Sequence, residues 1–507
     1  MEEEKPIHLE VACPEAGDKS KVPMKSEEEP NRNDELDNYV RNKAERHLVW
    51  KQDLFILPLL AISTFFGYLD RGQIGNARVM GMQKELGLTN QQWYNCIVMF
   101  FIGYGAIELP AGLLLRYWSP KYLFAGGLVT FGLGATCIAV ARSYAAVMSL
   151  RVIIGLGEVF VTNSYIYLSL WYKPTELSMR VALMYCMTPI AGAFSGLIAY
   201  GTAKNLEGAH GKASWQWLFI IEGAATLGFS LVVSMLLPGL PEVVAKKGSL
   251  LFRHPDERQI IHRRLAESQN MQNARIRPHQ ITMAFRDPKL YLGAAIIGAQ
   301  GIGIGAFAII LPTLINEFGF SALETQLYSM IPYAFGFFSM ITVPYIADRM
   351  HRKGITTACC LCITCLGFIL LLSTTNKPAL LAGTCFVVTG AYPGLAVSAA
   401  WFLTFHGGYT KRATAVWISQ VFVQAYSIIS TQVYRTPPRF FLGHAVALGL
   451  YGLAIACTLI LLSMLTRANK AKDFIQNEYE RRGETNPQNE IDFEELGDFH
   501  PSYRYAL

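Results

Sequence analysis

The sequence is dominated by about twelve runs of roughly 20 apolar residues, six before residue 240 and six after residue 288. A helix needs about 20 residues to cross roughly 30 Å of hydrocarbon. A chain inside a bilayer must satisfy its own backbone hydrogen bonds, and these runs are too long and too continuously apolar for barrel strands, so only helices fit. The sequence therefore predicts an all-α membrane protein with twelve transmembrane helices in two six-helix halves.

Composition and charge agree with this interpretation. The chain is 52% hydrophobic and only 16% charged, against about 25% charged residues in a soluble domain. We expect a disordered cytosolic tail at 1–50, a first half at 51–237, a cytosolic linker at 238–289, a second half at 290–466 and a cytosolic tail at 467–507. The linker stretch DERQIIHRRLAES predicts an amphipathic helix, either lying on the inner leaflet or solvated.

Lysine and arginine are concentrated in the segments that lie inside if the N-terminus is inside, so the positive-inside rule predicts that both termini are cytosolic. The net charge of +6 is then a signal of topology and requires no nucleic-acid partner. The plasma membrane is the expected location, and the lipid bilayer is the expected surroundings.

The fourth apolar run carries two charges where water is scarce. At 3.6 residues per turn, residues spaced three or four apart lie on one face of a helix. One face of this helix therefore carries Arg151, Gly155, Glu158 and Thr162, and Tyr165 extends it. Arg151 and Glu158 are about 10.5 Å apart along the axis, too far for direct contact, so each needs another partner or water.

Charges inside a membrane usually face a bundle interior or a wet cavity. One interpretation is a structural ion pair with another helix. The other is that Arg151 attracts an organic anion while Glu158 carries a coupled proton, with Asp70 as the alternative proton carrier. Asp70 ends the predicted span 54–70 and is followed by Arg71, so this pair can also serve as a helix-end anchor.

Further candidates lie on the later runs. Gln420 and Gln424 begin a polar stripe on the eleventh run, which either faces the same cavity or bonds neighbouring helices. Tyr392 and Trp401 are candidates for lining a pocket, although aromatics at such positions are more often core or interface anchors.

Enzyme and metal chemistry find no support in the sequence. The dense stretch CCLCITC at 359–365 lies in an apolar run without His or carboxylate beside it, which is typical of small buried hydrophobes. Because no Ser/His/Asp arrangement, metal-ligand spacing or phosphate loop is present, we expect a protein that is not an enzyme and has no metal or cofactor.

Two motifs resemble those of the major facilitator superfamily. ADRMHRKG resembles its cytosolic signature, with Asp348, Arg349 and Arg352 in matching places, and RVIIGLG resembles its second motif, which includes Arg151. The resemblance implies the major facilitator fold, with the site between the halves and alternating access, and a gating role for the cytosolic motif.

A narrower resemblance is to the fungal allantoate permease family of anion:cation symporters. It rests on YLDRGQIGNA, GLTNQQWYN, FFIGYGAIELP, RVIIGLGE, LSLWYKPTELSMR, LFIIEG, GYTKRATAV and IISTQVY. The family implies proton-driven symport of small carboxylates such as vitamins or ureides, and we expect a monomer. The sequence departs from the usual residues of this family at three places, and these departures affect the expected substrate. They are Gln73, the Val161–Asn163 stretch and the Phe405–His406 pair. Two alternatives stay open, an exporter of a fungal metabolite or drug and a substrate sensor that does not transport.

Overall fold

The computed structural model describes residues 32–162, 164–267, 278–407, 409–434, 436–437, 439–482, 486–490, 496–501 and 503–507. Every regular element in these ranges is an α-helix or a 3-10 helix. Residues Val49–Leu507 form one compact unit, and the arrangement below concerns this unit.

The first half contains six membrane-crossing segments and a short helix, α2 (Met82–Glu85). The six segments are α1 (Arg32–Val79), α3 (Asn90–Tyr117), α4 (Pro120–Ile138), α5 (Tyr144–Thr162) continued by α6 (Ser164–Trp171), α7 (Pro174–Tyr185) continued by α8 (Met187–Asn205), and α9 (Ser214–Leu236).

The second half repeats this plan after three linker helices, α10 (Pro241–Lys247), α11 (Pro255–Glu267) and α12 (Pro278–Arg286). Its segments are α13 (Pro288–Ile304) with α14 (Ala306–Glu317), α15 (Ala322–Tyr328) with α16 (Met330–Met350), α17 (Lys353–Ser373), α18 (Lys377–Phe402), α19 (Tyr409–Val433) and α20 (Phe441–Arg482). The remaining short elements are the 3-10 turns η1 (Ala209–Gly211), η2 (Leu403–Phe405), η3 (Pro487–Glu490) and η4 (Gly497–Phe499).

The number of spans follows from length and hydropathy. Among the described residues, 10 helices are long and apolar enough to cross a membrane, and the pair α13 and α14, bent by 44°, makes 11. Helix α3, at 28 residues, is long enough to add the twelfth span. The predicted twelve-helix, all-α fold is therefore the fold of this chain.

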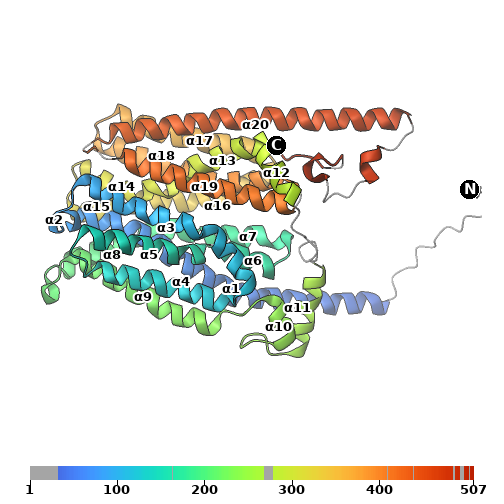
Figure 1. The fold of residues 1–507 in the computed structure, drawn as a ribbon, viewed down its shortest axis with the longest axis horizontal. Coiled ribbons are helices and arrows are strands. Elements are labelled where there is room, and N and C mark those ends of the chain that lie inside the picture. The colour runs from blue at the N-terminus through green and yellow to red at the C-terminus, as the bar shows by residue number, and fades with distance from the viewer. Residues whose placement is uncertain are drawn as a thin grey trace, which may run out of the picture. The chain divides into compact units, whose positions relative to one another are not determined.

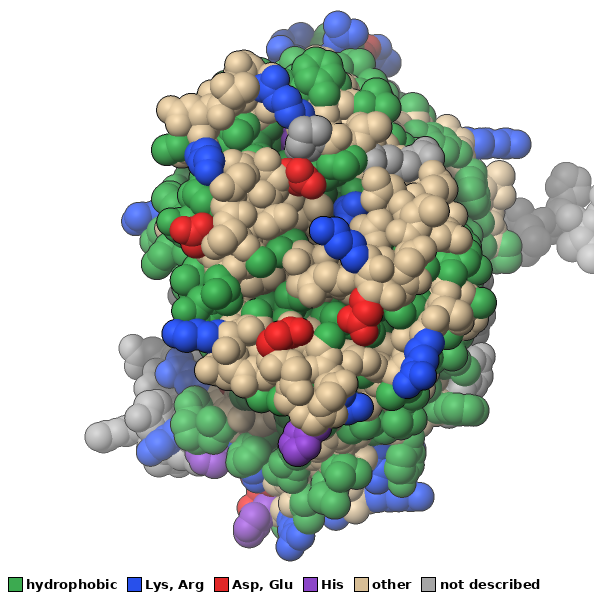
Figure 2. Space-filling model, turned by 90° about the vertical axis from the view of Figure 1, so that its left-hand side faces the viewer, with side chains coloured by type: hydrophobic (Ala, Val, Ile, Leu, Met, Phe, Trp, Pro, Cys, Tyr) green, Lys and Arg blue, Asp and Glu red, His purple; other side chains and the backbone are tan. Residues whose placement is uncertain are grey.

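The spans end at two faces. We call the face with residues 238–289 and the turn at 351–352 the linker side, and the face with loops 80–89, 206–213 and 374–376 the far side. Figure 1 places α2 and α15 of the far side at its left and the linker helices α10 and α11 at its right. Figure 2 shows the far-side face, over which charged side chains of both signs are scattered.

Glycines allow α5 to pack closely against its neighbours. A Cβ added at Gly155 would lie 2.3 Å from the carbonyl oxygen of Phe100, and one at Gly103 would lie 2.5 Å from that of Val152. Backbones that approach this closely are typical of helix contacts in membranes. Helix α5 is therefore held against α3, with its charged stripe directed into the half.

Both predicted tails differ from the structure. Helix α1 begins at Arg32, so residues 32–50 are helical, while residues 1–31 lie outside the described part of the chain. At the other end, α20 continues to Arg482, and residues 496–501 and 503–507 pack on the second half. The polar end of α20 is stabilised by hydrogen bonds from Asn469 and Lys472 to the carbonyl oxygens of Tyr505 and Asp498.

The linker helix α11 packs on protein. Ile261 is 2% exposed, Arg264 contacts Glu176 of α7 at 2.5 Å, and Glu257 contacts Lys51 of α1 at 2.6 Å. The expectation of an amphipathic helix on the leaflet missed these partners, because an apolar stripe does not reveal whether lipid or protein covers it.

Candidate functional site

Two crossed ion pairs join α1 to α5 inside the first half. Arg151 Nη1 lies 2.7 Å from Asp70 Oδ2, and the two side chains are 2% and 0% exposed. Arg71 Nη2 lies 2.6 Å from Glu158 Oε1, with exposures of 11% and 0%. Adjacent residues of α1 thus reach charges that lie two turns apart on α5, which gives each charge of the stripe a partner.

The predicted span 54–70 places Asp70 at the end of a helix, and the structure shows that this is wrong. Helix α1 runs to Val79, so Asp70 and Arg71 both lie well inside the helix. The apolar run ends at residue 70 because the next residues are polar, and the helix continues because those polar residues have buried partners. Asn76, for example, donates to Ser195 Oγ at 2.7 Å.

The Arg71 guanidinium is surrounded by aromatic rings. Its Cζ atom lies 4.7 Å from the ring centre of Tyr68, 5.2 Å from that of Phe100 and 5.4 Å from that of Tyr104. Ring faces attract a cation and shield it from competing water. Gly67 provides the space for the carboxylate partner, since a Cβ there would lie 3.1 Å from Glu158 Cγ.

A third carboxyl group lies near these pairs. Glu222 of α9 is 1% exposed, and neither of its oxygens has a hydrogen-bond partner among the described residues. It interacts electrostatically with Asp70 and Arg151. With every group ionised, the cluster of Asp70, Arg71, Arg151, Glu158 and Glu222 holds three negative and two positive charges, so one proton makes it neutral.

The two arginines border the second half. A narrow crevice is lined by Arg71, Ile74, Ile97, Phe100, Arg151 and Ile309. Ile309 belongs to α14, whereas the other five residues belong to α1, α3 and α5. The guanidinium groups of Arg71 and Arg151 thus lie at the boundary between the two halves.

Polar groups of the second half lie along the same boundary. Gln424 of α19 approaches α3, because a Cβ at Gly105 would lie 3.7 Å from its Cγ. Gln300 of α13 instead lies inside the second half, where its amide approaches Gly394 of α18. It is fully buried, and its amide oxygen and nitrogen have no hydrogen-bond partner among the described residues. The Tyr392 ring lies 6.4 Å from that of Tyr333, which in turn lies against Gly192 of α8.

The halves are in close contact toward the far side. A Cβ at Gly75 would lie 2.1 Å from the Ile309 carbonyl oxygen, and one at Gly196 would lie 2.6 Å from that of Gln326. Gln91 of α3 donates to Gln432 of α19 at 3.2 Å. These approaches bring α1, α3 and α8 against α14, α15 and α19.

The remaining predicted site residues are placed as follows. Tyr165 of α6 interacts electrostatically with Glu108 of α3, and Gln420 lies one turn before Gln424 on α19. The Thr162 side chain lies outside the described residues. Trp401 is separate from the ion pairs, at the linker-side end of α18, where its indole nitrogen donates to the Ala506 carbonyl oxygen at 2.9 Å.

The predicted gating motif lies on the linker side, with Asp348 and Arg349 in the last turn of α16 and Arg352 just before α17. Asp348 is 3.5 Å from Lys353, and its side chain is 69% exposed. Arg349 and Arg352 are also exposed. These three residues are not brought together with the ion pairs.

Sequence reasoning did not include Arg71, Glu222 and Gln300 among the site residues. The sequence predicts Arg71 as the partner of its neighbour at a helix end, and it gives no signal that joins Glu222 to these charges. The sequence does contain a signal for Arg71. If Asp70 balances Arg151, then Glu158 needs another positive charge, and Arg71 is an arginine next to Asp70 on the same helix. A single Gln in an apolar run gives no such signal.

Comparison with known proteins identifies the family. The sequence profile described as Major Facilitator Superfamily matches residues 60–431. The chain belongs to this superfamily. It is 30% identical over 441 residues to an uncharacterized transporter of Schizosaccharomyces pombe, covering 86% of this chain and 90% of the relative. It is also 25% identical to the high-affinity nicotinic acid transporter of Saccharomyces cerevisiae, covering 91% of this chain and 85% of the relative.

Solved structures agree with the fold. The inward-open xylose transporter XylE from E. coli matches with a TM-score of 0.62 at 13% identity, covering 81% of this chain and 96% of that one. An inward-facing bacterial homologue of the lysosomal transporter Spinster matches with a TM-score of 0.58 at 14% identity, covering 83% and 95%. The protein is thus a multi-pass membrane transporter of the major facilitator type, and not an enzyme.

Proposed function

We propose that this transporter is a proton-coupled symporter of a small organic anion, a carboxylate, that works by alternating access as in the fungal allantoate permease family. The observation that carries the proposal is that two arginines, the partly buried Arg71 and the buried Arg151, border a crevice at the boundary between the halves. The relative that is named a nicotinic acid transporter supports a carboxylate as the solute.

The ion pairs suggest how anion and proton are coupled. Arg151 is sealed against Asp70, whereas Arg71 is more exposed and its partner is Glu158. A solute carboxylate that contacts Arg71 competes with Glu158 for the same guanidinium. Because an unpaired charge is costly to bury, Glu158 then takes up a proton. Asp70 and Glu222 are the alternative proton carriers within the cluster.

This coupling fits the energetics of uptake. A proton carried with a monocarboxylate cancels its charge, so the membrane potential does not oppose entry. Once Glu158 and Glu222 are protonated, Arg71, Arg151 and Asp70 leave the cluster with one net positive charge, which favours an anion at the crevice. The aromatic rings around Arg71 hold its guanidinium in place when Glu158 leaves.

We further propose that the protein acts as a monomer in the plasma membrane, with both termini and the linker side in the cytosol. The lysine and arginine bias of the loops supports this orientation. Asp348, Arg349 and Arg352, exposed where α16 ends and α17 begins, are proposed to control opening at that side.

The test uses purified transporter in proteoliposomes with radiolabelled nicotinate as the first probe, followed by other carboxylates. Arg151→Ala and Arg71→Ala are expected to abolish saturable uptake, and Arg142→Ala, which changes an exposed arginine, serves as the control. Glu158→Gln is expected to exchange solute across the membrane without accumulating it in response to a pH gradient.

Four outcomes would contradict the proposal or a part of it. Saturable uptake by Arg151→Ala equal to that of the control would remove Arg151 from the pathway. Unchanged accumulation by Glu158→Gln would assign the proton to Asp70 or Glu222. In cells, greater retention of the carboxylate after loss of the gene would indicate an exporter, and binding without flux in proteoliposomes would indicate a sensor.

A further inference from the structure

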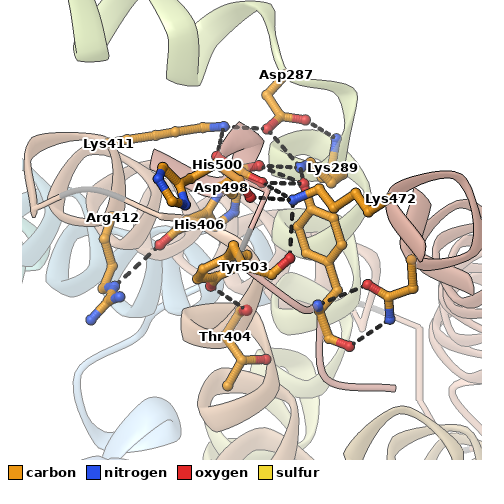
Figure 3. Close-up of polar contacts among 12 residues, drawn as sticks. Asp287, Lys289, Thr404, His406, Lys411, Arg412, Lys472, Asp498, His500 and Tyr503 are labelled. Carbon is orange, nitrogen blue, oxygen red and sulfur yellow. Dashed lines mark hydrogen bonds and ion pairs between the residues drawn. The ribbon is translucent and has the colours of Figure 1, made fainter. Parts of the chain in front are cut away.

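The segment at residues 496–501 and 503–507, called here the C-terminal segment, packs on the linker-side ends of the second half. Figure 3 shows Asp498 among lysines from three helices. Asp498 is fully buried. Its Oδ1 lies 2.6 Å from Lys411 Nζ, and its Oδ2 pairs with Lys289 Nζ.

A second carboxylate completes the cluster. Asp287 Oδ2 lies 2.7 Å from Lys411 Nζ and 3.4 Å from Lys289 Nζ. Two acids and two lysines therefore balance each other. Lys289 lies in the first turn of α13 and Lys411 in the first turn of α19, so Asp498 joins the beginnings of two helices that are far apart in the sequence.

The electrostatics of Asp498 match this position. Burial opposes its charged form, but the ammonium groups of Lys289 and Lys411 outweigh burial and hold the pKa of Asp498 below its ordinary value. The carboxylate is thus charged at neutral pH. A charged group in such surroundings is stable only while its partners are in place.

The rest of the C-terminal segment binds the other helices of the same half. Tyr503 donates its hydroxyl proton to the Thr404 carbonyl oxygen at 2.6 Å, next to the end of α18. The Tyr505 backbone nitrogen donates to Asn469 Oδ1 of α20 at 2.9 Å. Lys472 of α20 donates to the carbonyl oxygens of Asp498 at 2.6 Å and of Tyr503 at 3.0 Å.

We propose that the C-terminal segment is a brace of the second half and that Asp498 is its central positioning residue, which keeps the linker-side ends of α13 and α19 together as the two halves move. The named partners of the segment all belong to the second half. Alternating access requires each half to move largely as one body. Helix α19 carries Gln424, which approaches Gly105 of α3, so the position of α19 also sets part of the wall that faces the first half.

The test is hydrogen exchange of the purified full-length protein, read by mass spectrometry. Asp498→Asn is expected to speed amide exchange in the first turns of α13 and α19 by about tenfold or more, because it leaves two lysines with one acid. The matched control is Asp473→Asn, which removes an exposed pair with Arg504 of the same segment and is expected to leave these amides unchanged.

A second variant separates charge balance from general damage. Asp498→Asn combined with Lys411→Gln restores equal numbers of acids and lysines, and it is expected to recover most of the protection of α19. The brace is refuted if Asp498→Asn behaves like the control, if exchange rises equally in α3 and α5 of the first half, or if the double variant recovers nothing. None of these results depends on the solute or on proton coupling.

Discussion

At the scale of single residues, the arrangement of charge depends on which neighbour each group meets. Asp70 and Arg71 are adjacent in sequence, yet each pairs with a different residue of α5. A sequence places such groups on a helix but does not choose among their partners. The buried Glu222, which has no hydrogen-bond partner among the described residues, completes a cluster that only close packing assembles.

His406 offers a prediction at this scale. Burial, with the nearby Lys411 ammonium, lowers its pKa from the ordinary value of 6.5 to about 3. Between these pH values the unfolded chain binds a proton that the folded chain does not, so stability falls as pH decreases below about 6.5. His406→Gln is expected to lower the number of protons taken up on unfolding by about one, so that stability depends less steeply on pH. The measurement is the unfolding temperature in detergent from pH 7.5 to 4.5.

The control for this experiment is His262→Gln, because His262 is exposed on α11. It should leave the pH dependence of the wild type intact. Equal pH slopes for the His406 variant and the wild type would show that His406 does not contribute.

At the scale of elements, glycines decide how closely α1 and α8 approach the second half. Gly75 and Gly196 face backbone carbonyl oxygens across the boundary between the halves. The short GxxxG spacing of Gly192 and Gly196 predicts a close helix contact, but it does not say that Tyr333 and Gln326 are the partners. The length of α1 likewise depends on its buried polar partners beyond residue 70.

We expect Gly75→Ala to disfavour the closed far side. The added Cβ would lie 2.1 Å from a backbone oxygen, so α1 and α14 must separate. A cysteine introduced at the buried Ser329, beside Gly196, should then react about tenfold faster with an impermeant maleimide added from the far side, which corresponds to about 1.4 kcal/mol.

Gly201→Ala is the comparison for this measurement, because a Cβ at Gly201 would meet nothing within 4 Å. If both alanine variants label at the same rate, then contact at Gly75 does not control the far-side closure.

At the scale of the whole molecule, two halves of six spans are joined by a linker that is anchored at both of its ends. Helix α11 is held on the first half by Arg264 and Glu257. Gln280 of α12 accepts hydrogen bonds from the backbone nitrogens of Thr410 and Lys411 on the second half. The linker is therefore attached to both halves.

An even number of spans predicts that both ends of the chain lie on one side of the membrane. Reporters fused before Met1 and after Leu507 should both be digested by protease only when the cytosolic face is accessible, since the basic loops lie on that face. Protection of one reporter and digestion of the other would mean an odd number of spans.

The sequence by itself determined the membrane class, the plan of two halves and the superfamily, because long apolar runs and ordered local motifs need no tertiary information. It also placed Arg151 and Glu158 on one face of a helix. Only the tertiary structure decided that Asp70 and Arg71 are their partners, that Trp401 contacts the C-terminal segment, that Asp498 of this segment pairs with Lys289 and Lys411, and that α11 packs on protein. Partners distant in sequence are chosen by packing, and periodicity along a single helix carries no record of which surface covers it.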